Sequence, residues 1–242
     1  MGIDASIMPT NYKLNLKQTQ ILLLTYKFRF VTTSLLAQYR QTSTIWTIQK
    51  SLAVLVKQGY LYRRYEKHYK IDRLPAIYFL TPQAMQLLKA NPELNSNILH
   101  ARYKDRYLKQ GTIDHHLLVF QTYLDIKKQH PDRFIIFTKY ELWGYDHLPE
   151  PLPDLYVTQD NGTDIMVEIY TTSTQPYLIR KRIDQLIKHY EDSSDQDSYP
   201  SIQIIVPTKY LEESLNRYIK KKKDERYIDD SELIINASLE TK

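Results

Sequence analysis

Between residues 40 and 73 the sequence gathers side chains that can hydrogen-bond to nucleobases or neutralise phosphates. The candidates for contacts with base edges are Thr44, Thr47, Lys50 and Ser51. Basic side chains surround them and are the candidates for phosphate contacts: Arg40, Arg63, Arg64, Lys67, Lys70 and Arg73. Trp46 would lie either at the interface or in the core. Together, these residue types indicate recognition of double-stranded DNA.

A predicted helix over residues 43–58 would carry the candidates for contacts with base edges. Apolar residues at positions 45, 48, 52, 55 and 56 have the spacing of one buried stripe. Ser43 is the expected N-cap, and Gly59 stands where a glycine commonly ends a helix. The polar residues listed above would therefore share the outer part of this helix.

A predicted basic hairpin would carry most of the candidates for phosphate contacts. Two β-rich runs, residues 60–65 and 76–80, are separated by a basic loop, and Thr81-Pro82 can begin another helix. With helices predicted over residues 16–26 and 34–39, this is the outline of a winged helix–turn–helix. The alternative is a small helix–hairpin part of a core with a solvated hairpin.

The charge distribution divides the chain in two. Residues 1–110 carry 17 Lys and Arg against 5 Asp and Glu, whereas residues 111–242 carry 16 against 23, within a net charge of +5. This asymmetry predicts that the first half faces a polyanion. The alternative is ordinary solvation of a surface.

Composition excludes several classes of protein. The 242-residue chain has no cysteine, so disulfides and thiolate metal sites are excluded. No apolar run is long enough to span a membrane, and the N-terminus lacks the pattern of a signal peptide. We therefore expect a cytoplasmic protein. No glycine-rich phosphate loop is present, which disfavours nucleotide hydrolysis.

Residues 91–112 are predicted to connect two domains. Arg102, Lys104, Arg106 and Lys109 are interleaved with tyrosines here. Tyr103 and Tyr107 would either extend the DNA contact with these basic residues or belong to a solvated connecting helix. The sequence does not choose between the two.

The second half has the predicted order α-β-β-β-α-β-α-β. It comprises helices over residues 114–129, 176–190 and 210–223, and strands over residues 133–140, 154–158, 164–170, 201–206 and 232–235. Asp160-Asn161-Gly162-Thr163 supplies a hairpin turn. The order predicts a mixed sheet with helices on both faces.

This order, with Pro153-Asp154 on the second strand and Glu168-Ile169-Tyr170 on the third, resembles the PD-(D/E)xK nuclease-like fold. Preceded by the winged helix, it is similar to the replication-relaxation family of plasmid and mobile-element proteins over roughly residues 15–206. The other segments that carry the resemblance are Gly59-Tyr60-Leu61, Tyr78-Phe79-Leu80-Thr81-Pro82 and His115-His116-Leu117. The family name implies a role in plasmid replication or DNA relaxation.

The resemblance implies two catalytic carboxylates, Asp154 and Glu168, which would bind Mg²⁺, with Glu141 as a third. The lysine of the family pattern is replaced by Tyr170, whose neutral phenol cannot stabilise a developing negative charge as an ammonium does. A migrated lysine could come from Lys181 or Lys188. The preferred interpretation is an inactive site in which Arg180, Arg182 or backbone donors satisfy the carboxylates. His115 and His116 are interpreted as packing residues, because adjacent residues of a helix point in different directions.

The sequence thus predicts an α+β or α/β chain: a winged helix–turn–helix over residues 1–90, a linker or connecting helix over 91–112, and a nuclease-like mixed β-sheet with flanking helices over 113–242. The expected function is sequence-specific binding of double-stranded DNA by a regulator or accessory factor in replication or transfer of a mobile element, with no cofactor. The alternatives are a Mg²⁺-dependent endonuclease and a winged helix that binds protein. Besides DNA, the partners considered are a second copy of the chain and a replication or mobilisation protein.

Overall fold

The computed structural model describes residues 14–71, 73–129, 134–160 and 162–240. The chain divides into two compact units, Met1–Leu124 (unit 1) and Asp125–Lys242 (unit 2). The division falls later than the expected end of the linker at residue 112. Its cause is that α7 (Gln110–Gln129) packs its first turns within unit 1, where the ring of Phe120 stacks on Phe28 at 3.8 Å. No helix in the described part of the chain is long and apolar enough to cross a membrane.

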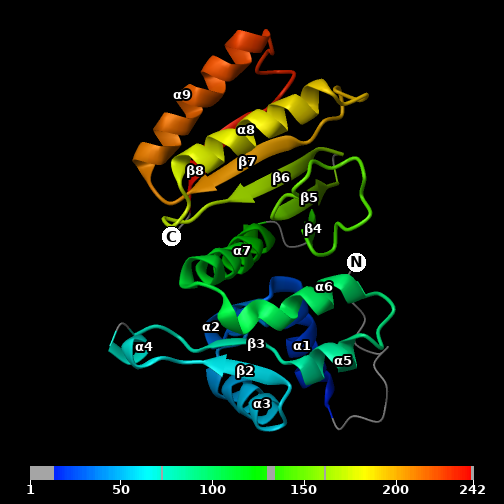
Figure 1. Cartoon of the computed structure of the whole chain (residues 1–242), viewed down its shortest axis with the longest axis vertical. Coiled ribbons are helices and arrows are strands. Elements are labelled where there is room, and N and C mark those ends of the chain that lie inside the picture. Colours follow the sequence, from blue (N-terminus) through cyan, green and yellow to red (C-terminus); the bar gives the residue numbers. More distant parts are fainter. Residues whose placement is uncertain (1–13, 72, 130–133, 161, 241–242) are drawn as a thin grey trace. The chain divides into compact units, whose positions relative to one another are not determined.

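Unit 1 is a helical unit with a small antiparallel sheet (Figure 1). Its elements before α7 are α1 (Leu16–Phe28), β1 (Val31–Thr32), α2 (Thr33–Tyr39), α3 (Ile45–Lys57), β2 (Leu61–Arg64), α4 (Lys67–Ile71), β3 (Ile77–Leu80), α5 (Pro82–Leu88), α6 (Ser96–Ala101) and the 3-10 helix η2 (Arg102–Tyr107). The strand order is β1-β3-β2, with Val31 opposite Tyr78 and Leu61 opposite Leu80. Three helices followed by a hairpin that pairs with β1 form a winged helix–turn–helix, as predicted.

Local sequence signals explain where these helices begin and end. Thr32 caps α2 by accepting a hydrogen bond from the Leu35 amide, and Thr81 caps α5 in the same way before Pro82. Gly59, with φ of +77°, ends α3: its amide donates to Val56 O, and the next amide donates to Leu55 O. This is a Schellman motif, which favours glycine at the left-handed position. The predicted cap at Ser43 is wrong by one residue, because the N-cap is Thr44 and its side chain makes no capping hydrogen bond.

The wing differs from the predicted basic loop because it contains the short helix α4. Tyr69 on α4 is 1% exposed, and its hydroxyl donates to Gln110 Oε1 at 2.8 Å. Its ring belongs to a buried cluster with Phe30, Phe79 and Ile113. This anchor holds the base of α4 to the unit, so the loop prediction is wrong for residues 67–71.

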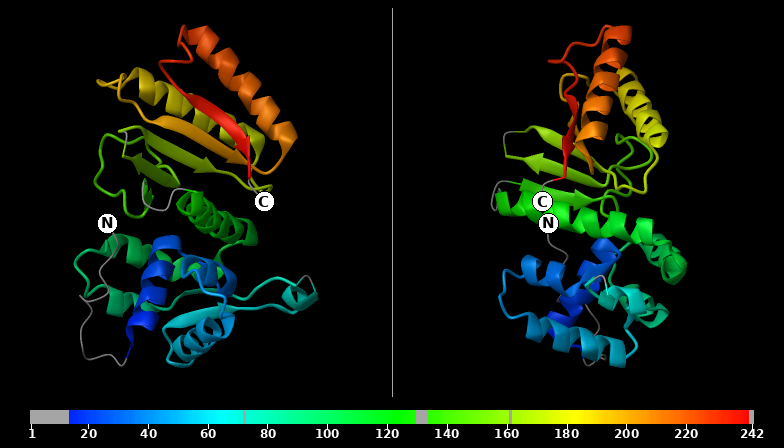
Figure 2. Two further views of the ribbon diagram at one scale, coloured as in Figure 1. Left: turned by 180° about the vertical axis from the view of Figure 1, so that it is seen from behind. Right: turned by 90° about the vertical axis from the view of Figure 1, so that its left-hand side faces the viewer.

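Unit 2 consists of a mixed sheet and the long helices that pack on it (Figure 2). Its elements are β4 (Phe134–Thr138), β5 (Leu155–Gln159), β6 (Asp164–Ile169), α8 (Pro176–Glu191), β7 (Ser201–Val206), α9 (Lys209–Arg226) and β8 (Ile235–Leu239). The strand order is β4-β5-β6-β7-β8. The first three strands are antiparallel, whereas β6, β7 and β8 are mutually parallel. The mixed sheet is confirmed.

Helices α8 and α9 lie on the same face of the sheet. Both pack on the face that carries Met166, Ile204 and Ala237, in one core with Ile183 and Leu215. The two parallel crossovers, β6-α8-β7 and β7-α9-β8, advance in the same direction across the sheet. Since such crossovers are right-handed, they place both helices on the same face.

Candidate functional site

The outer face of α3 carries exposed side chains opposite its buried stripe. Ile48, Leu52 and Leu55 are fully buried, whereas Trp46 is 65% exposed. Lys50, one turn after Trp46, is exposed and places its Nζ 5.2 Å from the centre of the indole ring. The sequence left open whether Trp46 lies at the interface or in the core, and the structure places it on the surface.

Two of the candidate base-contacting residues, Thr47 and Ser51, lie one turn apart on the same side of α3. Thr47 Oγ1 donates to Thr44 O at 2.9 Å, and Ser51 Oγ donates to Thr47 O at 3.0 Å. Their hydrogens are thus used within the helix, and their oxygens can still accept a hydrogen bond. Thr44 is exposed at the helix start.

Some of the candidate phosphate-contacting residues lie exposed on the wing. Arg63 on β2 is exposed, with its guanidinium 5.0 Å from the ring centre of Tyr65. Lys70 and Arg73 are exposed as well. The side chain of Lys67 lies outside the described residues. Charged groups in these positions are accessible to an anion.

Two of the predicted phosphate-contacting residues make hydrogen bonds within the chain instead. Arg40 donates through Nη2 to Lys17 O at 2.7 Å. Burial lowers the pKa of Arg40, and the neighbouring Tyr39 opposes this shift only in part. Arg64 donates to Glu66 Oε1 at 2.8 Å and to Leu108 O at 3.1 Å. Both guanidinium groups are therefore held against the protein, which disfavours them as phosphate ligands.

A cleft of about 730 Å³ separates α3 from the wing. Gln49, Ala53 and Lys57 line it from α3, and Arg63 and Tyr78 line it from the strands. Sequence reasoning missed Gln49 and Lys57. The signal was present, since residues on the outer side of a helix follow from the positions of its buried stripe, here Ile48, Leu52 and Leu55.

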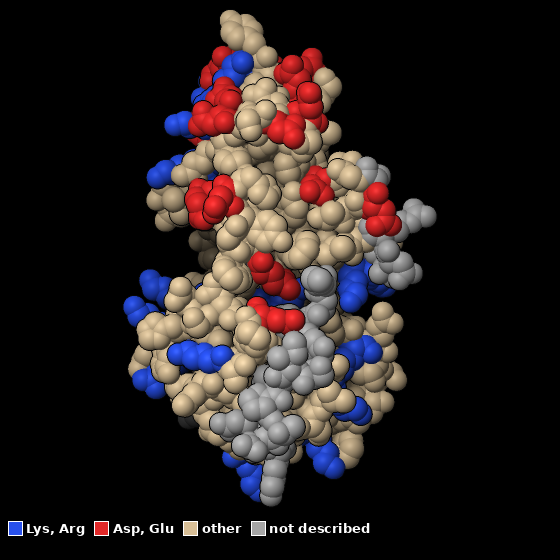
Figure 3. Space-filling model, turned by 90° about the vertical axis from the view of Figure 1, so that its right-hand side faces the viewer, with Lys and Arg blue, Asp and Glu red and all other residues tan. Residues whose placement is uncertain are grey.

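The predicted charge asymmetry is visible on the molecular surface. On the face drawn in Figure 3, Lys and Arg side chains are spread over unit 1, whereas Asp and Glu gather mainly over unit 2. The buried Asp105 in unit 1 accepts two hydrogen bonds from Arg29, at 2.7 and 2.9 Å. Asp105 is therefore turned inward and paired with Arg29.

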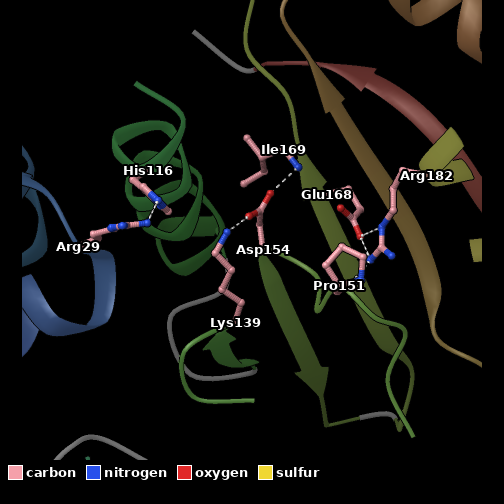
Figure 4. A network of polar contacts seen from close by, with 8 residues as sticks. All are labelled: Arg29, His116, Lys139, Pro151, Asp154, Glu168, Ile169 and Arg182. Atoms are coloured by element: carbon pink, nitrogen blue, oxygen red, sulfur yellow. Dashed lines mark hydrogen bonds and ion pairs between the residues drawn. The ribbon is translucent and has the colours of Figure 1, made fainter. Parts of the chain in front are cut away.

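The histidine pair makes packing and hydrogen-bond contacts within unit 1. His116 is 4% exposed, and its Nε2 lies 3.1 Å from Arg29 Nη1 (Figure 4). The rings of His115 and His116 are turned at 69° to each other. A cation beside the imidazole disfavours a metal ion at the same nitrogen, in agreement with the interpretation of these histidines as packing residues.

In unit 2, the two candidate catalytic carboxylates are each bound to a cationic side chain (Figure 4). Asp154 Oδ1 accepts from Lys139 Nζ at 3.0 Å, and Oδ2 accepts from the Ile169 amide at 3.1 Å. Glu168 Oε1 accepts from Arg182 Nε at 2.9 Å and from Nη2 at 2.5 Å. The same Nη2 donates to Pro151 O.

Burial governs the electrostatics of this cluster. Asp154, Glu168 and Arg182 are 7%, 6% and 6% exposed. Burial raises the pKa of Glu168 to about 7; the Arg182 charge opposes this shift and the Asp154 charge adds to it. For Lys139, burial alone would lower the pKa, but the charges of Asp154 and Tyr140 and the hydrogen bond with Asp154 together outweigh burial, so the pKa is raised. Burial, with a smaller contribution from the Glu168 charge, raises the pKa of Tyr170.

The residues of this cluster do not fit a divalent cation. A metal ion would need carboxylate oxygens that face a shared space, whereas Lys139 and Arg182 occupy these positions. Glu141, the proposed third ligand, accepts from the Thr138 amide at 2.8 Å. Among residues 14–71, 73–129, 134–160 and 162–240, no three His, Cys, Asp or Glu side chains are grouped as metal ligands.

The structure also identifies residues that sequence reasoning missed in this cluster. Lys181 and Lys188, considered as migrated lysines, are exposed on α8. The lysine beside Asp154 is Lys139, which follows β4. Since Thr138 pairs with Leu155 in the antiparallel register, position 139 must face position 154. Arg182 was one of the hydrogen-bond donors considered for these carboxylates. Its position between Ile179 and Ile183 on the buried stripe of α8 indicated that its side chain would be buried.

Comparison with known proteins adds little to these findings. The chain matches no family model and no curated protein. Among solved structures, a mutant of Lactococcus lactis ZitR has 17% identity, with 50% of this chain and 78% of that chain covered and a TM-score of 0.29. The adhesin competence repressor AdcR from Streptococcus pyogenes has 20% identity, with 50% and 85% covered and a TM-score of 0.28. At such TM-scores these structures carry no argument, and the winged-helix assignment stands on the element order and the sheet of unit 1.

Proposed function

We propose that this protein binds double-stranded DNA sequence-specifically through unit 1. The observation that carries the proposal is the exposed outer face of α3, with Trp46 and Lys50, next to the exposed Arg63 of the wing. A helix presented beside a basic hairpin fits the major groove, while the hairpin follows the phosphates. The excess of Lys and Arg in residues 1–110 supports the same partner.

Roles follow from the positions of the side chains. Thr44, Thr47 and Ser51 would accept hydrogen bonds from base edges, and Lys50 would donate to them. Arg63, Lys70 and Arg73 would contact phosphates, joined by Lys57, which lines the cleft beside α3. Arg40 and Arg64 are removed from this set because their guanidinium groups have partners within unit 1.

The biological setting of this proposal rests on the sequence resemblance. A replication-relaxation protein would act as a regulator or accessory factor in replication or transfer of a plasmid or mobile element. In this setting unit 2 is a nuclease-like domain without activity, which binds a second copy of the chain or a replication or mobilisation protein. The paired state of Asp154 and Glu168 supports the inactive interpretation.

A Mg²⁺-dependent endonuclease is the second candidate. The observation in its favour is Lys139, whose ammonium lies 3.0 Å from Asp154 Oδ1 and supplies the charge that Tyr170 lacks. Arg182 stands against it, because its guanidinium occupies the carboxylate of Glu168. We therefore favour a DNA-binding protein without cleavage activity.

The two candidates predict different outcomes for one incubation with supercoiled plasmid DNA. We expect gel retardation without strand breakage in EDTA, Mg²⁺ and Mn²⁺ alike, and we expect Asp154→Ala to retard DNA as the wild type does. The matched control is Lys50→Ala, which should weaken retardation while leaving the cluster of unit 2 intact. Nicking that requires metal and disappears in Asp154→Ala would overturn the inactive interpretation and favour the nuclease.

A further inference from the structure

A second groove lies on the face of the small sheet opposite α3. Successive residues of a strand point to opposite faces. Accordingly, Tyr78 lines the cleft beside α3, whereas Tyr62 and Phe79 line two cavities on the other face. These cavities, of about 410 and 230 Å³, share Tyr62, Phe79 and Arg106, so they form one groove between β2 and η2. We refer to it as the β2–η2 groove.

Exposed tyrosine rings are concentrated around this groove. Tyr62, Tyr103 and Tyr107 are 37%, 48% and 70% exposed, although aromatic rings are usually largely buried. Arg106 lies 4.4 Å from the ring centre of Tyr107 and donates a hydrogen bond to the Tyr107 hydroxyl. The groove thus offers flat apolar faces beside a guanidinium group.

The charge of the groove is positive. Arg63, Arg64 and Arg106 line the larger cavity, together with Glu66. Glu66 accepts a hydrogen bond from Arg64 at 2.8 Å, and the lining as a whole contains three arginines and one carboxylate. Lys104, exposed on η2, adds to the positive charge nearby. The lining therefore complements a ligand that is anionic and carries flat rings.

We propose that the β2–η2 groove binds single-stranded nucleic acid, with bases stacked on Tyr103 and Tyr107 and phosphates held by Arg106. Proteins that bind single strands combine a basic groove with aromatic side chains in this way. In a duplex the faces of the bases are covered by their neighbours in the stack, so a duplex cannot use these rings. The inference goes beyond the function proposed above, which concerns duplex DNA and α3.

The proposal predicts that stacking on Tyr107 supports binding of a labelled oligo-dT. In fluorescence anisotropy with the full chain and an oligomer of about 20 nucleotides, Tyr107→Ala should weaken binding about tenfold, and Tyr107→Phe, which keeps the ring, should stay within about twofold of wild type. Tyr210→Ala is the matched control, because Tyr210 is a 78% exposed tyrosine on α9 of unit 2. Tyr107 is so exposed that its removal should leave the thermal midpoint unchanged. Wild-type affinity in Tyr107→Ala, or an equal loss in Tyr107→Phe, would overturn the proposal.

Two further ligands separate base stacking from phosphate binding and from binding of duplex DNA by α3. An abasic oligomer of the same length should bind at least about tenfold more weakly than oligo-dT; equal binding would mean that the groove recognises phosphates alone and would overturn the proposal. An oligo-U arm distinguishes DNA from RNA as the preferred strand. Lys50→Ala should weaken duplex binding and leave oligo-dT binding unchanged, so failure of either proposal can be recognised independently of the other.

Discussion

Replacing Arg182 by methionine is expected to destabilise unit 2 by about 3–5 kcal/mol, because it leaves the Glu168 carboxylate buried without its ionic partner. Glu168 is 6% exposed, so water cannot substitute for the guanidinium. A loss of this size is a large part of the total stability of a typical domain. Urea unfolding followed by circular dichroism would measure it. Arg180→Met is the matched control, because Arg180 is exposed on the same helix and should change stability by less than about 0.5 kcal/mol.

A second variant and a series of pH values show whether the loss of stability comes from the unpaired charge or from lost packing. Glu168→Leu combined with Arg182→Met removes both charges and should recover most of the lost stability. The pKa of Glu168 is raised from 4.5 to about 7 in the folded protein, so the folded state holds a proton that the unfolded state releases between these values. Stability should therefore fall as pH rises through this window. In Arg182→Met, where the opposing Arg182 charge is absent, the fall should continue to higher pH than in wild type, and the double variant should lack this dependence. If the double variant is as unstable as Arg182→Met at every pH, the buried charge is not the cause.

Removing three positive charges around the cleft of unit 1 should have the largest effect on DNA binding. Lys50, Lys57 and Arg63 are exposed on α3 and β2. Changing all three to alanine should weaken binding of a duplex by about 100-fold at about 150 mM salt, because the lost phosphate contacts of Lys57 and Arg63 each remove the release of about one counterion and the base-edge contact of Lys50 is lost as well. Fluorescence anisotropy with a labelled duplex measures this change.

The matched control removes the same charge from unit 2. Lys181, Lys188 and Lys220 are exposed on α8 and α9, and their replacement by alanine should change duplex affinity by less than about threefold. Net charge is then equal in the two triple variants. Equal losses in both would show that the overall charge, and not the surface of unit 1, attracts DNA.

Sequence patterns predicted the helices and strands whose signals are local. The stripe of α3, its terminal Gly59 and the Thr81-Pro82 helix start depend on neighbours within a few residues, and the structure has all three. β1 has two residues and α4 has five, too few for any periodicity. Tyr69 fixes α4 through Gln110, a partner 41 residues away, which no local pattern reveals.

In the candidate sites, too, contacts between residues distant in sequence could not be predicted from local patterns. Exposure of α3 followed from its buried stripe, but the partners of Arg40 and Arg64 lie 23 and 44 residues away in sequence. The carboxylates Asp154 and Glu168 were recognised from the resemblance, whereas their cations depended on strand register for Lys139 and on helix facing for Arg182. Long-range pairing, which decides whether a charged group is accessible, was the part that the sequence did not specify.

The dependence of duplex binding on salt tests the central claim most directly. We would measure the affinity of wild-type protein for a labelled duplex over a range of about 50 to 300 mM salt, and compare it with the variant in which Lys50, Lys57 and Arg63 are alanine. The account predicts a steep linear fall of log affinity with log salt in the wild type, and a slope smaller by about two in the variant, because Lys57 and Arg63 are its lost phosphate contacts. A slope near zero, or the same slope in both proteins, would contradict DNA binding by α3 and the wing.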